Sequence, residues 1–281
     1  MRDSDAIPAF SRAKSGGGEV GVANMSALAA GPGIKSAREV AAIIAVAVVV
    51  IGGAELALRL FNVPQYVMPA PSLIVAALFT EFPLILPHLG HTLVELFSGF
   101  GIGALTGLIL AAVITQFPFA EKIITPYILV LVTTPMLALV PLLILRFGFG
   151  YTPRIIVVAL AAGPMVMINA ATGFRRVDRG KLALARSYGA STLQMFWKIR
   201  APMALPMILV GLMIGAIFGL LTAVGAEMVG GGFGLGNRLT SYSSMIQMPQ
   251  FFAVVLILSI LGILIYVLFY FIGKKWASWE A

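Results

Sequence analysis

A few polar and ionisable side chains lie within or at the ends of long hydrophobic runs, and these are the residues with which the chain could act on a solute. Glu227 lies near the end of one run, Asn169 is a lone amide in another, and Thr133, Thr134 and Met136 lie where a third is interrupted. Ionisable residues at membrane depth usually face the interior of a helix bundle. We therefore predict a pathway or gate role for Glu227. We predict the same role for Thr133, Thr134 and Met136, because broken helices in transporters line cavities, and for the lone amide of Asn169. Two simpler alternatives stay open: a hydrated helix end for Glu227, and a bond to a neighbouring helix for Asn169.

Catalysis and metal binding have little support in the sequence. The chain has no cysteine, and its two histidines are His88 and His91. Thiolate chemistry is therefore excluded and a metal site is poorly supported. No nucleophile–base constellation is visible, and the glycine-rich stretches 99–103 and 230–232 lack the Lys-Ser/Thr of a phosphate-binding loop. We expect no catalytic residue and no metal. Glu95 follows His91 by one helical turn, and the two could form a hydrogen-bonded pair of structural importance.

The composition indicates a membrane protein. Of the 281 residues, 60% are hydrophobic and only 11% are charged, whereas soluble domains carry about 25% charged residues. Six hydrophobic runs are each near the ~20 residues that a helix needs to cross a bilayer. They lie at about 40–60, 89–114, 123–145, 155–172, 203–226 and 251–272. The runs lack period-2 alternation and are too long for membrane strands, so we predict an all-α polytopic membrane protein.

Lysine and arginine are distributed unevenly between the two predicted sides of the membrane. With the N-terminus in the cytoplasm, 15 of the 19 basic residues lie on that side, and only Arg59, Arg146, Arg154 and Arg238 lie outside. This bias predicts that both termini are cytoplasmic. Residues 1–36 are polar and rich in Gly and Ser, so we expect a disordered cytoplasmic tail there. Residues 37–281 form the predicted transmembrane domain.

Prolines and glycines predict where helices break or approach one another. Pro135 and Pro141, with the adjoining threonines, interrupt the third run, and broken helices in transporters line cavities. Prolines at 64, 69 and 71 predict an extended entry to the second run. Ser72 could then cap a short interfacial helix over about 72–82. Glycines at four-residue spacing predict close helix packing; they are Gly99, Gly103 and Gly107 in the second run and Gly211, Gly215 and Gly219 in the fifth.

The long basic loop before the fifth run has a pattern that topology alone does not require. Residues 181–188 are good helix formers, and Gly189 follows where a helix could end in a left-handed conformation. Ser191 and Gln194 then fit a capping box, which predicts a second short helix over about 192–199. We expect two short helices that meet at a bend. Such a rigid pair favours docking of a partner protein over a loop that only fixes orientation.

This loop resembles the EAA loop of bacterial ABC import permeases, whose pattern is E-A-A, three residues, G, nine residues, I-x-L-P. Ala183-Leu184-Ala185 stands at the E-A-A position, so Ala183 replaces the Glu. Gly189 matches the glycine, and Ile199 with Ala201-Pro202 matches the end of the pattern. The resemblance implies that the loop over 173–202 couples to an ATPase. The implied coupling residues are Ala183, Leu184, Ala185, Arg186, Gly189, Ala190, Ser191, Ile199 and Pro202.

The resemblance covers about residues 64–275 and is closest in kind to the nitrate/sulfonate/taurine-type permeases. Pro69-Ala70-Pro71-Ser72 is similar to their P-S-P-S entry, and residues 134–141 are similar to their I-P-P-L-A-L-L-P run. Phe147-Gly148 with Gly150, and Asn169 with Gly173, match further segments. Ala226-Glu227-Met228, followed by Gly234-Leu235-Gly236, resembles A-E-M…G-L-G. The chain is therefore similar to type I ABC importer permeases.

The resemblance implies a transport complex in the bacterial cytoplasmic (inner) membrane. Two permease copies, most simply a homodimer, would form the pathway with two cytoplasmic ATPase subunits, which alone would use ATP and Mg²⁺. A periplasmic or lipid-anchored binding protein would deliver a small, anionic solute such as nitrate, taurine or another sulfonate, or a related organic acid. No nucleic acid partner is expected. An ion-gradient-driven secondary transporter or channel is the alternative, and a membrane-embedded scaffold is a third reading.

Overall fold

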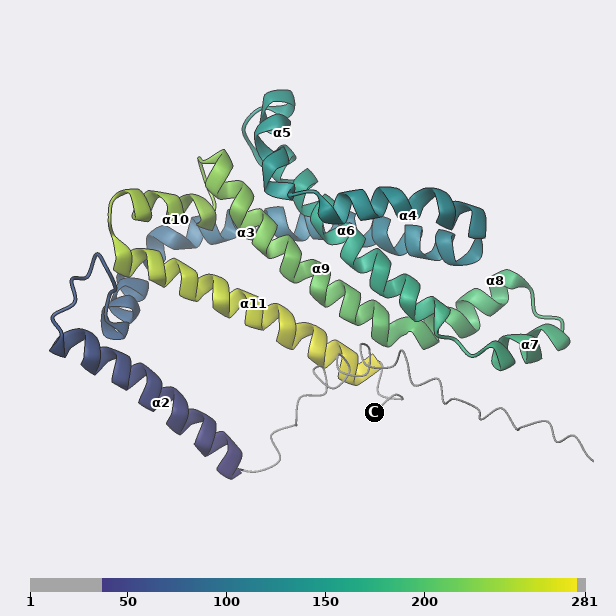
Figure 1. The fold of residues 1–281 in the computed structure, drawn as a ribbon, viewed down its shortest axis with the longest axis horizontal. Helices are drawn as coiled ribbons and strands as arrows, with labels where there is room; N and C mark the ends of the chain where they lie inside the picture. The colour runs from purple at the N-terminus through teal and green to yellow at the C-terminus, as the bar shows by residue number, and fades with distance from the viewer. Residues whose placement is uncertain (1–36, 277–281) are drawn as a thin grey trace, which may run out of the picture. The chain divides into compact units, whose positions relative to one another are not determined.

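The computed structural model describes residues 37–276, and the elements of this part of the chain are helices joined by short connections (Figure 1). Contacts divide the chain into two units, residues 1–54 and residues 55–281. The predicted tail at 1–36 lies outside the described residues. Helix α2 (Ala37–Leu60) crosses from the first unit into the second and confirms the first predicted hydrophobic helix.

Four long helices dominate the second unit, and they correspond to the second, fourth, fifth and sixth predicted runs. They are α3 (Pro71–Gln116), α6 (Tyr151–Arg175), α9 (Ala201–Gly230) and α11 (Met248–Trp276). Within residues 37–276, five helices are long and apolar enough to cross a membrane. The third run forms two helical segments with a break between them. The first is α4 (Pro118–Thr133), and the second consists of η1 (Met136–Ala138) followed by α5 (Leu139–Phe147). The pair is bent by 80°, and it makes a sixth span if it counts as one.

Helix α6 packs between α3 and α9 by means of small residues. A Cβ added at Gly99 would lie 2.6 Å from Val158 Cβ and 2.9 Å from the Ile155 carbonyl oxygen, so α3 and α6 approach to near backbone contact. On the other side, a Cβ at Gly215 would lie 2.8 Å from a methyl carbon of Val166. The predicted glycine faces are therefore confirmed as packing surfaces. In lipid, close van der Waals packing of this kind is a main source of helix association.

The start of α3 differs from the expectation at Ser72. The helix runs without interruption for 46 residues, its N-cap is Ala70, and Pro71 occupies the first turn, where the missing N–H of proline costs nothing. The prediction of a separate short helix capped by Ser72 is wrong. The Ser72 N–H and hydroxyl instead donate to the two carboxylate oxygens of Glu55, at 3.0 and 2.7 Å. Glu55 also accepts from Arg59 at 2.6 Å.

Helix α10 (Leu235–Ser244) was not predicted, because its ten residues are too few and too polar to form a hydrophobic run. It packs on α3, α9 and α11 with Leu235, Leu239 and Tyr242 buried. The Tyr242 hydroxyl donates to Glu81 Oε2 at 3.1 Å. Burial, this hydrogen bond and the Glu81 charge raise the pKa of the Tyr242 phenol. The helix therefore exists because tertiary contacts cover its apolar side.

Candidate functional site

The basic loop forms two helical segments that meet at a tight bend. Helix α7 (Arg179–Ser187) begins at Asp178, whose carboxylate accepts the Gly180 N–H at 2.8 Å. It ends before Gly189, which has a φ of +78°. This left-handed conformation is one that glycine adopts at little cost, and the predicted stop signal is confirmed.

The second segment begins with the predicted capping box. The Ser191 Oγ accepts the Gln194 N–H at 3.2 Å, and the Gln194 Oε1 accepts the Ser191 N–H at 2.9 Å. Helix α8 (Thr192–Met195) does not end near Ile199 as expected. It continues through a π-helical turn, η2 (Phe196–Arg200), into α9. Pro202 has no N–H to give to the preceding turn, and the wider turn absorbs that loss.

Buried aromatic residues hold the base of this loop against the bundle. Phe196 packs on Phe174 of α6 with ring centroids 5.1 Å apart, and both belong to a hydrophobic cluster with Ala204 and residues of α3 and α4. The segments α8, η2 and α9 form one continuous helical path (Figure 1).

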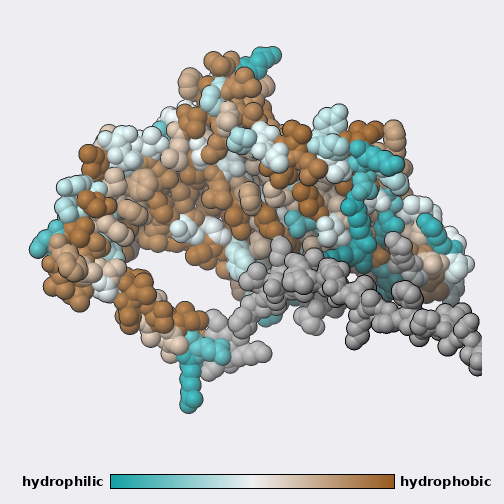
Figure 2. Space-filling view, viewed as in Figure 1, coloured by the Kyte–Doolittle hydropathy of each residue, from teal (hydrophilic) through white to brown (hydrophobic). Residues whose placement is uncertain are grey.

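The tip of the loop presents hydrophobic, aromatic and cationic side chains together. Leu184, Tyr188, Leu193 and Trp197 are large and exposed, with Tyr188 83% exposed. A hollow of about 360 Å³ lies among Tyr188, Gly189, Ala190, Gln194, Met195, Lys198 and Ile199. The chain has no acidic residue between Asp178 and Glu227. Hydrophilic surface gathers toward this end of α9, whereas hydrophobic surface covers much of the rest of the visible face (Figure 2). A surface of this composition suits a protein partner.

The predicted coupling residues surround this hollow and bend. Gly189, Ala190 and Ile199 line the hollow itself. Ala183, Leu184, Ala185 and Arg186 lie on α7, Ser191 caps α8, and Pro202 is in the first turn of α9. The positions that the family pattern separates by up to nineteen places are thus brought onto one compact loop.

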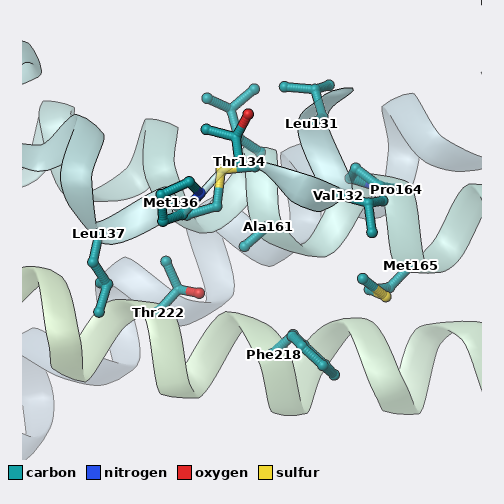
Figure 3. Close-up of a pocket in the computed structure, with 12 residues that line it drawn as sticks. Leu131, Val132, Thr134, Met136, Leu137, Ala161, Pro164, Met165, Phe218 and Thr222 are labelled. Carbon is teal, nitrogen blue, oxygen red and sulfur yellow. The ribbon is translucent and has the colours of Figure 1, made fainter. Parts of the chain in front are cut away.

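A second candidate region is a cavity of about 330 Å³ beside the break between α4 and α5. Thr134 and Met136 from the break, Ala161, Pro164 and Met165 from α6, and Phe218 and Thr222 from α9 face this space (Figure 3). The remaining lining residues are Leu131, Val132, Pro135, Leu137 and Leu160. None of these lining residues, all in the described part of the chain, is charged. The cavity therefore offers an apolar wall with two hydroxyl groups and two thioethers.

Three of the five predicted pathway residues lie outside this lining. Thr133 is exposed on α4, and its hydroxyl donates to the Leu129 and Val130 carbonyl oxygens of its own helix. Asn169 donates to the Met165 carbonyl oxygen at 2.8 Å, also within its own helix, so the bond is not between helices. Glu227 is fully buried near the end of α9. A pathway role for all five residues stays a prediction.

Glu227 belongs to a buried polar cluster that the sequence did not predict as a unit. Arg154 of α6, only 2% exposed, donates to Glu95 Oε1 of α3 at 2.9 Å. It also donates to the carbonyl oxygens of Gly231 and Phe233, in the turn between α9 and α10. Its guanidinium carbon lies 4.3 Å from the centre of the Phe233 ring. This cluster fixes the turn to α3 and α6.

The proposed pairing of Glu95 with His91 is not the one that the structure contains. Glu95 pairs with Arg154, and His91 Nδ1 is hydrogen-bonded to the Tyr151 hydroxyl. Arg154, which the charge count assigns to the outer side of the membrane, is buried within the protein as the fourth residue of α6. Buried charges need partners of opposite sign. That rule could have suggested an Arg154–Glu95 pair, but it could not have chosen between Glu95 and Glu227.

Comparisons with known proteins agree with this fold. Residues 103–278 match the family described as "Binding-protein-dependent transport system inner membrane component". A "Probable ABC transporter permease protein" of Haemophilus influenzae is 30% identical over 75% of this chain and 86% of its own length. The "Riboflavin transport system permease protein RibX" of Chloroflexus aurantiacus is 27% identical over 78% of this chain and 82% of its length. The "Taurine transport system permease protein TauC" of Escherichia coli is 30% identical over 63% of this chain and 65% of its own length.

A solved structure of the MetNI methionine ABC transporter, in an inward-facing conformation, has the same fold. Its TM-score is 0.62 at 18% identity, and the alignment covers 70% of this chain and 97% of that chain. The chain belongs to the family of binding-protein-dependent transport system inner membrane components. It is a membrane-embedded permease subunit of an ABC importer.

Proposed function

We propose that the loop formed by α7, α8 and η2 is the surface on which a separate ATPase subunit docks. The observation that supports this is a rigid bend whose tip exposes Tyr188 and Trp197 beside Lys198, while its base is anchored by Phe196. Two ATPase subunits would bind ATP and Mg²⁺, and this chain would bind neither. Closure of the ATPase dimer would move the loop, and the continuous α8–η2–α9 path would carry that movement to the cavity.

The complex would contain two copies of this permease, most simply as a homodimer. A periplasmic or lipid-anchored binding protein would deliver the solute on the side opposite the basic loop. Both termini would lie in the cytoplasm with that loop, as the distribution of Lys and Arg favours. Residues 37–281 would form the transmembrane domain, preceded by a cytoplasmic tail.

The solute that we propose is a small organic anion of the taurine or sulfonate kind. The resemblance to nitrate/sulfonate/taurine-type permeases and the likeness to the E. coli taurine permease support this class. The uncharged cavity accommodates the organic part of such a solute, because its wall is largely apolar with the hydroxyl groups of Thr134 and Thr222. Arg154 does not support an anion, since Glu95 already neutralises it.

The test is co-purification of the tagged chain from its native membrane, followed by reconstitution and uptake assays. We expect a stoichiometric ATPase subunit in the eluate and uptake that requires ATP. The double variant Tyr188→Ala/Trp197→Ala should lose the ATPase. Phe149→Ala is the matched control, because Phe149 is an equally exposed aromatic residue outside the loop, and this variant should retain the ATPase.

Two results would contradict the proposal. The first is a chain that purifies alone and transports with an ion gradient in the absence of ATP, as the secondary-transporter alternative requires. The second is retention of the ATPase by the double loop variant. For the solute, taurine and other alkanesulfonates should compete for uptake. Competition by riboflavin but not by alkanesulfonates would replace the organic anion with a neutral heteroaromatic solute.

A further inference from the structure

The turn between α9 and α10 covers a cluster of three buried ionisable side chains, Glu95, Glu227 and Arg154. Both glutamates are fully buried and Arg154 is 2% exposed. If both carboxyl groups were ionised, two negative charges would share one guanidinium. A second buried negative charge without its own counter-ion is costly in a region of low dielectric constant.

The other charged and titratable groups around the cluster do not supply the missing positive charge. His88 Nδ1 accepts the Gly234 N–H at 3.1 Å, which requires that this ring nitrogen carry no proton. His91 is engaged with Tyr151 and stacks near Phe233. Arg238 lies over the Tyr242 ring, with its guanidinium carbon 5.9 Å from the centre. Arg154, which pairs with Glu95, is thus the cation available to the two glutamates among the described residues.

The hydrogen bonds of the four carboxyl oxygens leave one of them unpaired. Glu95 Oε1 accepts from Arg154. Glu227 Oε1 accepts from the Thr92 hydroxyl at 2.7 Å, and Glu227 Oε2 accepts from the Gly236 N–H, also at 2.7 Å. Within the described part of the chain, no donor reaches the buried Glu95 Oε2. The Glu227 carboxyl shares this buried cluster with Glu95, and two ionised carboxylates cannot hydrogen-bond to each other.

We propose that Glu95 and Glu227 form a single-proton binding site. Glu227 carries the proton and donates it to Glu95 Oε2, while Glu95 remains the carboxylate that pairs with Arg154. The proton comes from water, and on release it returns to water. This one hydrogen removes the unpaired acceptor and the excess charge together. This proton site does not depend on which solute or ATPase the permease uses.

The site holds the turn between α9 and α10 in place. Gly231, Gly232 and Gly234 have φ values of +62°, +85° and +95°, and so the turn has a backbone that few other residues adopt. Arg154 binds the carbonyl side of this turn. Glu227 binds its N–H side through Gly236, and Thr92 accepts the Leu235 N–H at 2.9 Å. Loss of the proton would leave a second carboxylate charge beneath the turn and weaken this attachment.

Infrared spectroscopy of the purified full-length chain tests the site directly. A protonated carboxylic acid has a C=O stretch that is separate from carboxylate and amide bands. We expect wild type to show this band at neutral pH, Glu227→Gln to lose it, and alkaline titration to remove it from wild type. Glu227→Gln should fold, because its amide can donate to Glu95 Oε2 while its oxygen accepts from Gly236. Thr92 can then donate to the His88 carbonyl oxygen, which lies 3.1 Å away.

Thermal stability gives a second readout. At neutral pH the folded chain holds a proton that an ordinary glutamate in the unfolded chain has lost. The free energy of unfolding therefore falls as the pH rises, until the folded chain has lost that proton as well. This decline should be present in wild type and absent in Glu227→Gln. Glu95→Gln should instead lower the melting temperature at all pH values, because it removes the partner of Arg154. The proposal would be overturned if both variants kept the infrared band, or if only Glu95→Gln lost it. It would also be overturned if Glu227→Gln had the same pH profile of stability as wild type.

Discussion

Replacement of Gly103 by alanine tests the close contact between α3 and α6, on which the arrangement of the bundle depends. A Cβ at this position would lie 2.6 Å from the Ala159 carbonyl oxygen and 3.1 Å from both Ala159 Cα and the Gly163 nitrogen. All three are backbone atoms, so no side-chain rotation can relieve the overlap and the two helices must separate. Overpacking of this kind costs about 1–3 kcal/mol.

The matched control is Gly101→Ala in the same helix. Gly101 is exposed, and a Cβ there would meet nothing within 4 Å. Both variants gain about 1 kcal/mol from the higher helix propensity of alanine. This gain cancels in the comparison, which leaves a difference of about 1–3 kcal/mol due to packing. Gly101→Ala should therefore be slightly more stable than wild type, and Gly103→Ala should be between neutral and about 2 kcal/mol less stable.

The assay is the melting temperature of the detergent-purified chain, followed by fluorescence-detected size exclusion after heating. For a chain of this size, 1 kcal/mol corresponds to roughly 2–4 °C, so the two variants should differ by about 2–12 °C. Equal melting temperatures would show that α3 and α6 do not approach at Gly103, and the packing argument would fail. Transport activity should fall together with stability in Gly103→Ala, because α6 and α9 also line the cavity.

Three other substitutions have defined outcomes. Gly189→Ala should lower stability by about 1–2 kcal/mol, because alanine is strained in the left-handed conformation. The cost comes entirely from the backbone, since a Cβ at Gly189 would meet nothing within 4 Å. The amount of co-purified ATPase and the solute-stimulated ATP hydrolysis should both fall, and wild-type levels of both would refute this. Arg154→Leu should lower stability by about 3–5 kcal/mol, because Glu95 is left buried without its partner; Arg146→Leu, at an exposed position, should change the melting temperature little. Thr222→Val removes a cavity hydroxyl with little change of shape and should raise the uptake KM about 2- to 12-fold if the solute bonds to it; Thr106→Val, whose hydroxyl bonds its own helix, should leave KM unchanged.

Features that depend on nearby residues could be predicted from the sequence. The hydrophobic helices follow from run length, since a helix satisfies its backbone within the segment. The bend at Gly189 and the Ser191–Gln194 capping box follow from residues only a few positions apart. The break near Pro135 is local for the same reason, although its 80° angle is not. In each case the deciding interaction lies within one or two helical turns.

Other features were decided by contacts between distant segments. Helix α10 is stable only because α3, α9 and α11 cover it, and α8 merges with α9 because the loop base is anchored on α6. The 330 Å³ cavity lies where the broken helix meets α6 and α9. As a result, Thr134 and Met136 line the cavity but Thr133 does not.

The buried charges show the division most clearly. The sequence alone determined the membrane class, the family pattern and the chemistry of the exposed loop, because composition and short motifs carry that information. It also placed Glu95, Arg154 and Glu227 near the ends of hydrophobic runs. Only the tertiary structure decided that Arg154 pairs with Glu95, 59 residues away, and that Glu227 is buried in the same region. Partners at such separations are chosen by how the helices pack, and local sequence does not encode that choice.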